Sequence, residues 1–153
     1  MKEVAIVVLS WNAQPLLERY LPDLVRHTPL GLADIILADN GSSDASVAYA
    51  KSLGVKVIEL GENYGFARGY NEAIARIEHN YVLLLNNDVR VSPGWLEPLY
   101  HFMETHTEVA GFPKAAYVPA RRDSSPHLQC RSAVRHRFPV AQSPVAETEC
   151  EYC

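Results

Sequence analysis

The chain has no cysteine before residue 130, no excess of basic residues and no apolar run long enough to cross a bilayer. Its three cysteines, Cys130, Cys150 and Cys153, all fall in the last 24 residues, which favours free thiols over a disulfide framework, with a zinc site as the weaker alternative. The net charge of -4 indicates no surface for nucleic acid. No small-residue cleavage site follows the first apolar run, so we expect a cytoplasmic protein without a transmembrane segment, the inner face of the membrane being the alternative location.

What the sequence does have is a series of short apolar runs that end in polar residues. Such runs are typical of strands buried on both faces of a parallel sheet. They are Val4–Leu9, Ile35–Ala38, Val55–Leu60 and Tyr81–Leu85, with a fifth candidate at Val109–Phe112. Between them, apolar residues recur at helical spacing. The alternation predicts an α/β fold with a mostly parallel, doubly wound sheet flanked by helices.

Two helices carry specific expectations. The first spans about 15–27 and contains Pro22, which predicts a kink or a late start. The last is expected to begin at Ser92-Pro93 and run to about His106.

The composition changes after residue 114. Residues 115–153 hold four prolines, five arginines and no glycine, and their apolar residues follow neither a helical nor an alternating period. We therefore predict two parts, a domain at 1–114 and an atypical, weakly ordered tail at 115–153.

Polar clusters follow three of the predicted strands, namely Ser10–Asn12, Asp39–Asp44 and Asn86–Asp88. The loop Asn63–Asn71 contains glycines and leads into a helix, where unpaired N–H groups favour phosphate oxygens. Ligands of open α/β sheets bind at the carboxyl ends of the strands. A nucleotide diphosphate with a divalent cation fits these clusters, because hard cations take oxygen ligands from carboxylates and phosphates. Each cluster could alternatively be only a polar turn.

Four segments together resemble the nucleotide-binding half of a family 2 glycosyltransferase with the GT-A (Rossmann-like) fold, near its rhamnosyltransferase-like members. They are Val7–Asn12, Asp39–Asp44, Asn63–Asn71 and Leu83–Asp88. The resemblance implies inverting transfer of a sugar from a UDP- or dTDP-sugar to an acceptor hydroxyl on a glycan or lipid-linked acceptor, in cell-surface polysaccharide synthesis. Nothing after residue 115 resembles the family's acceptor half. The alternative is therefore a non-catalytic nucleotide-sugar-binding module or a truncated fragment.

On the base side, the resemblance implies that Asp39 accepts a hydrogen bond from a ring N–H of the donor's base. Ser10 and Asn12 match the loop beneath the base and ribose. Trp11, between them, is expected to be a packing residue, a stacking platform being the alternative.

On the phosphate side, the resemblance places Gly65 and Arg68 in the loop that closes over the nucleotide. Arg68 is alternatively a solvated surface charge. Asn86 matches a ribose contact in place of the family's first Asp. Asp88 matches the carboxylate that holds Mg²⁺ or Mn²⁺. We identify no catalytic base, because Glu147, Glu149 and Glu151 stand in the unpatterned tail.

Overall fold

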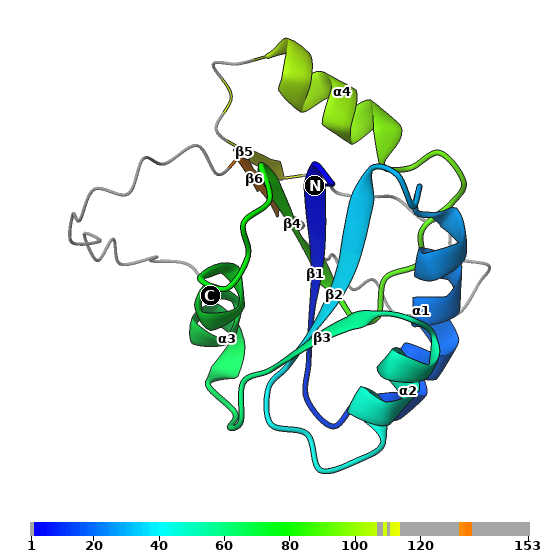
Figure 1. The fold of residues 1–153 in the computed structure, drawn as a ribbon, viewed down its shortest axis with the longest axis vertical. Coiled ribbons are helices and arrows are strands. Elements are labelled where there is room, and N and C mark those ends of the chain that lie inside the picture. Colours follow the sequence, from blue (N-terminus) through cyan, green and yellow to red (C-terminus); the bar gives the residue numbers. More distant parts are fainter. Residues whose placement is uncertain (1, 107–108, 110, 114–131, 136–153) are drawn as a thin grey trace, which may run out of the picture.

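The computed structural model describes residues 2–106, 109, 111–113 and 132–135, and these form helices around a central sheet (Figure 1). The strands are β1 (Val4–Ser10), β2 (Ala33–Asp39), β3 (Lys56–Glu59), β4 (Tyr81–Asn86), β5 (Gly111–Pro113) and β6 (Ser132–Arg135). Their order across the sheet is β3-β2-β1-β4-β6-β5. The first four strands in that order pair in parallel, which confirms the predicted sheet.

The helices cover both faces of the sheet. They are α1 (Gln14–His27), α2 (Ser46–Ser52), α3 (Gly65–Ile74) and α4 (Glu97–Thr105). Buried residues of α1, α2 and α4 belong to one core cluster, and those of α3 belong to a second. In Figure 1, α3 accordingly lies across the sheet from α1 and α2.

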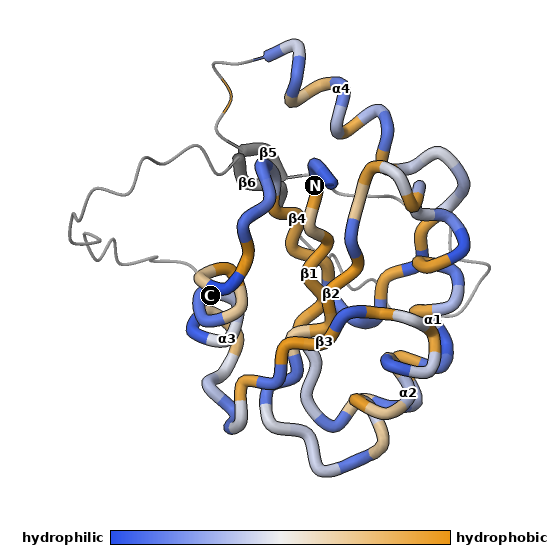
Figure 2. The backbone as a smooth tube through the Cα atoms, in the orientation of Figure 1, coloured by the Kyte–Doolittle hydropathy of each residue, from blue (hydrophilic) through white to orange (hydrophobic). Residues whose placement is uncertain are grey.

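Residues of β1 alternate between these two clusters. Val4, Ile6 and Val8 pack in the first cluster, while Ala5 and Val7 pack in the second. This alternation follows from the two-residue period of a strand, and both sets are apolar because both faces are covered. The strands therefore form the hydrophobic centre of the chain (Figure 2).

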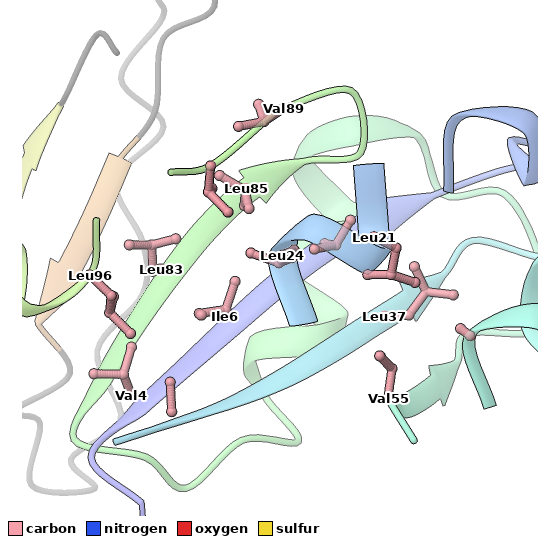
Figure 3. Close-up of a cluster of buried hydrophobic side chains, with 14 of the residues drawn as sticks. Val4, Ile6, Leu21, Leu24, Leu37, Val55, Leu83, Leu85, Val89 and Leu96 are labelled. Atoms are coloured by element: carbon pink, nitrogen blue, oxygen red, sulfur yellow. The ribbon is translucent and has the colours of Figure 1, made fainter. Parts of the chain in front are cut away.

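Among the helices, α1 contributes the most residues to the first cluster. Its buried residues Leu17, Leu21 and Leu24 recur every three or four positions. Figure 3 shows Leu24 over Ile6 of β1 and Leu21 beside Leu37 of β2. The helix runs through Pro22 from Gln14 to His27, so the predicted late start is wrong. Packing of these leucines outweighs the one backbone hydrogen bond that Pro22 cannot donate.

The outer strands beyond β4 differ from the sequence prediction. Strand β5 begins at Gly111 rather than Val109, and β6 lies between β5 and β4, antiparallel to both. Strand β6 comes from the segment 115–153, so the predicted weakly ordered tail contributes four residues to the sheet. A strand this short is too brief to show an alternating pattern. The three cysteines, the three tail glutamates and the rest of that segment lie outside the described residues.

The sequence predicted that the last helix begins at Ser92-Pro93. Helix α4 instead begins at Glu97, four residues after Pro93. Met103 of this helix and Leu96, which directly precedes it, are buried with Val4 and Leu83 in the first core cluster. In the part of the chain that the structure describes, no helix has the length and apolar character needed to span a membrane.

Asp34 forms a buried ion cluster near the amino ends of the strands. Its carboxylate pairs with Lys2 Nζ at 2.7 Å, with Lys56 Nζ and with His79 Nε2 at 3.1 Å. Burial alone would raise the pKa of Asp34, but the hydrogen bonds from Lys2, Lys56 and His79 outweigh it and hold the pKa well below its usual range.

We expect Asp34→Asn to lower the free energy of unfolding at pH 7 by about 1–3 kcal/mol, less than for a fully buried pair because both lysines reach solvent. The folded pKa lies below the unfolded value of about 3.9, so the carboxylate stabilises fully above that pH and less as the pH falls. The difference between the two proteins should therefore shrink below about pH 4. Urea denaturation at pH 7, 5 and 3 measures it, with Glu18→Gln on α1 as the exposed control. A difference that stays constant down to pH 3 would contradict the assignment.

Candidate functional site

The register of the parallel strands brings the predicted polar residues together. Ser10 at the end of β1 is level with Asp39 at the end of β2, and Leu9 is level with Asn86 at the end of β4. The loops after β1 and β2 leave the sheet at the lower edge of Figure 1. The strand order β2-β1-β4 therefore places three of the sequence motifs side by side at one edge.

Ser10 and Asp39 are buried at this edge with polar atoms that have no hydrogen-bond partner among the described residues. Asp39 Oδ2 accepts a hydrogen bond from Ser42 N–H at 3.0 Å, which leaves Oδ1 unpartnered. The hydroxyl of Ser10 is likewise unpartnered. Such groups are rare in native structures and mark places where a ligand can supply the missing bonds.

Asn12 fastens the loop after β1 to the loop after β2. Its backbone N–H donates to Ser42 Oγ at 2.9 Å, and its Oδ1 accepts from Ser43 N–H at 2.7 Å. The residue has a φ of 47°, a left-handed conformation that Asn adopts more readily than most residues. Next to it, Trp11 is 53% exposed, so the prediction that it is a packing residue is wrong. Strand β1 ends at Ser10, and the Trp11 ring that follows lies at the surface.

Asn40 is a site residue that the sequence analysis missed. Its buried side chain donates to Asn63 Oδ1 at 2.9 Å and to the Gly65 carbonyl at 3.1 Å, and it accepts from Tyr64 N–H at 3.0 Å. One amide thus holds the loop before α3 against the end of β2. Its place between Asp39 and a glycine suggested only a turn, because the partners are more than 20 residues away.

Gly65 and Arg68 lie at the start of α3. Gly65 has a φ of 75° and its N–H donates to Asn63 Oδ1 at 2.9 Å, which closes the turn that begins the helix. The guanidinium of Arg68 lies 4.0 Å from the centre of the Tyr64 ring, and its Nε is 3.7 Å from Glu72 Oε1. Arg68 is exposed.

A pocket of about 220 Å³ lies at the ends of β1 and β4. It is lined by Leu9, Phe66, Tyr70, Asn86, Asn87 and Asp88. The hydroxyl of Tyr70 donates to the Leu85 carbonyl at 3.1 Å. Burial raises the pKa of Tyr70 to about 12, a backbone hydrogen bond from Leu9 lowers it, and the Asp88 carboxylate raises it. Tyr70 is therefore a neutral donor that holds the end of β4 near Asp88.

The oxygen atoms of Asn86–Asp88 suit a hard cation only when a ligand completes the set. Among the described residues, no group of three or more His, Cys, Asp or Glu side chains could hold a metal ion. Mg²⁺ in nucleotide sites is often held by one or two carboxylates together with phosphate oxygens. Asp88 fits such a shared site. Asn86, in place of a second carboxylate, leaves it with one fewer negative charge.

Comparisons with known proteins agree with this arrangement. Residues 5–143 match the sequence profile of glycosyl transferase family 2. A protein of Mycobacterium tuberculosis (strain CDC 1551 / Oshkosh) described as "Putative glycosyltransferases" is 29% identical over 105 residues, which cover 65% of this chain and 28% of that protein.

Two solved structures share the fold. S. aureus TarS 1–349 in complex with UDP-GlcNAc superposes with a TM-score of 0.66 at 20% identity, over 80% of this chain and 37% of that one. The mannosyltransferase PcManGT from Pyrobaculum calidifontis, in complex with GDP-Man and Mn²⁺, gives a TM-score of 0.53 at 20% identity, over 57% of this chain and 28% of that one.

The chain spans less than two fifths of the length of each of these three proteins. The fold is the GT-A fold that the four motifs implied. Since the family profile covers nearly all of the sequence, the chain belongs to glycosyl transferase family 2.

Proposed function

We propose that the carboxyl edge of the sheet binds a nucleotide-diphosphate sugar, and that the whole protein transfers this sugar to an acceptor hydroxyl with inversion. The observation that carries the proposal is the pair of buried, unpartnered atoms on neighbouring strands, Ser10 Oγ and Asp39 Oδ1. Burial of these two polar atoms without hydrogen bonds costs free energy, and a ligand that bonds both of them removes that cost. Membership of the family supports a nucleotide sugar as that ligand.

The chemistry of Asp39 requires a base with a ring N–H, and the resemblance of the sequence motifs favours a pyrimidine as that base. An ionised carboxylate only accepts hydrogen bonds, so it selects a base edge that carries an N–H. Uracil and thymine present a ring N–H between two carbonyl groups, and the Ser10 hydroxyl can donate to a neighbouring carbonyl. We therefore propose a UDP- or dTDP-sugar. The UDP-GlcNAc complex of TarS supports uridine, while the GDP-Man complex of PcManGT makes guanine the competing base to test.

The other motifs suit the remainder of the donor. We infer that the N–H groups at the start of α3 and the side chain of Arg68 bond phosphate oxygens, with Gly65 forming the turn. Asn86 would bond the ribose, and Asp88 would hold Mg²⁺ or Mn²⁺ against the diphosphate. Such an ion, when bound, neutralises the charge that develops on the leaving diphosphate.

Transfer also needs a base that deprotonates the acceptor hydroxyl, and we assign none among the described residues. The acceptor, a glycan or lipid-linked glycan, and a cytoplasmic role in cell-surface polysaccharide synthesis are proposed from the motifs, as is the rhamnosyltransferase-like branch. A non-catalytic donor-binding module is the alternative for this chain. Donor binding without measurable donor turnover would favour the module.

Asp39→Asn tests the base assignment. We expect UDP affinity to fall by about 10- to 150-fold, which corresponds to the roughly 1.5–3 kcal/mol of a hydrogen bond to a charged group. Calorimetric titration with UDP, dTDP and GDP in Mn²⁺ measures the change, and Asp23→Asn on α1 is the control carboxylate. Equal affinities for wild type and Asp39→Asn would leave Asp39 as a turn residue only. A tighter fit for GDP than for UDP in the wild type would replace the pyrimidine with guanine.

A further inference from the structure

The pocket at the ends of β1 and β4 has an apolar wall and a polar wall. Leu9, Phe66 and Tyr70 form the apolar wall, and Asn86–Asp88 forms the polar one. This combination suits a ligand ring that has C–H groups on its face and hydroxyl groups around its rim. A sugar ring has that character, because apolar walls with a few placed polar groups fix the orientation of such ligands.

Phe66 is the exposed part of the apolar wall. Its side chain is 68% exposed, whereas Tyr70 beneath it is buried. The two rings meet edge to face, with centroids 5.0 Å apart and planes at 77°. This contact holds the Phe66 ring in a defined place at the pocket mouth. A single exposed apolar side chain is ordinary on a protein surface, and it is the position over Asn86–Asp88 that distinguishes Phe66.

The location relative to Asp39 indicates which part of a donor reaches the pocket. Asp39 and Ser10 end β2 and β1, while the pocket lies between the ends of β1 and β4. Neighbouring strands are about 4.8 Å apart. When the base of a donor binds at Asp39, the group attached to that base therefore lies about one strand spacing away, at the pocket between the ends of β1 and β4.

We propose that this pocket receives a sugar ring of the donor, and that Phe66 is a specificity-determining residue that covers the C–H face of that ring. The amide of Asn86 or Asn87 meets the ring hydroxyls on the opposite wall. Tyr70 positions the site from below, by supporting the Phe66 ring and bonding the Leu85 carbonyl. The inference rests on the proposed function, because it requires a nucleotide-sugar donor.

Phe66→Ala and Phe66→Tyr test the inference by calorimetry with uridine, UDP and UDP-GlcNAc in Mn²⁺. We expect Phe66→Ala to weaken binding by about 5- to 30-fold, the contribution of a buried aromatic contact, and Phe66→Tyr to stay within about threefold of wild type because it keeps the ring. An equal loss for all three ligands identifies the ribose as the covered ring. A loss for UDP-GlcNAc alone identifies the transferred sugar.

Leu30→Ala is the matched control, since Leu30 is 73% exposed in the loop before β2, at the opposite edge of the sheet. Thermal melting of each variant checks that the fold is retained. If Phe66→Ala binds all three ligands as the wild type does while Asp39→Asn weakens UDP, this inference is wrong and the proposed function stands. If the wild type binds none of the three and binds neither dTDP nor GDP, both are wrong.

Discussion

Replacing Asp88 with Ala should remove the metal-dependent part of UDP binding, with affinity in Mn²⁺ falling by about 100-fold or more. Asp88 is the one carboxylate in the Asn86–Asp88 segment, and the neighbouring Asn86 cannot supply a negative charge in its place. A cation bridging the diphosphate to this segment would thus lose its charged protein ligand. The side chain stands in a loop at the sheet edge, so the fold should remain intact.

Calorimetry with UDP in Mn²⁺ and in EDTA separates the two contributions. The wild type should lose affinity when the metal is chelated, and Asp88→Ala should bind equally weakly in both conditions. Glu18→Ala, at an exposed position on α1, controls for loss of a carboxylate elsewhere. Retention of Mn²⁺-dependent affinity by Asp88→Ala would remove this residue from the metal site.

Gly41→Ala should be the most destabilising single change at the site, lowering the free energy of unfolding by about 2–4 kcal/mol. Gly41 has a φ of 79°, in the left-handed region that residues with a Cβ rarely adopt. An added Cβ would lie 2.8 Å from Glu62 Cα and 2.9 Å from Glu62 C. These are backbone atoms, so the clash can be relieved only by moving the loop after β3 away from the loop after β2.

Gly54→Ala separates the two causes of the effect. Gly54 has a φ of 74°, but an added Cβ would meet nothing within 4 Å. It should therefore show only the conformational penalty of about 1–2 kcal/mol. Urea denaturation of both variants measures the difference. Equal losses at Gly41 and Gly54 would show that the two loops do not constrain each other. A larger loss at Gly41 should be accompanied by weaker UDP binding, because Asp39 and Asn40 precede it directly.

The strands and helices were largely predictable because their signals are local. Val4–Leu9 and Tyr81–Leu85 are continuously apolar, as a strand covered on both faces must be, and both appear as strands of nearly those lengths. Leu17, Leu21 and Leu24 recur at helical spacing in α1. The structure departs from these expectations where local signals were weak or were outweighed. Pro22 was outweighed by the packing of its helix, and β6 was too short to show a pattern.

Residues of the candidate site were predictable as neighbours where a polar cluster follows a strand, as at Ser10, Asp39 and Asn86–Asp88. Asn40, Phe66 and Tyr70 were not. The hydrogen bonds of Asn40 reach Asn63 to Gly65, and such pairings cannot be read from neighbouring residues. Phe66 and Tyr70 are ordinary helix residues by sequence. They acquire their place in the pocket only because α3 packs across the ends of β1 and β4.

The amino-acid sequence by itself determined the α/β class, the parallel core and the family motifs, because burial and helical or strand period are properties of neighbouring residues in the chain. The tertiary structure alone decided which motifs are neighbours. The order β2-β1-β4 places Asp39, Ser10 and Asn86 side by side, although β4 begins 42 residues after β2 ends. It also left Ser10 Oγ and Asp39 Oδ1 buried without a partner in the part of the chain that the structure describes, since burial depends on every side chain that packs around them.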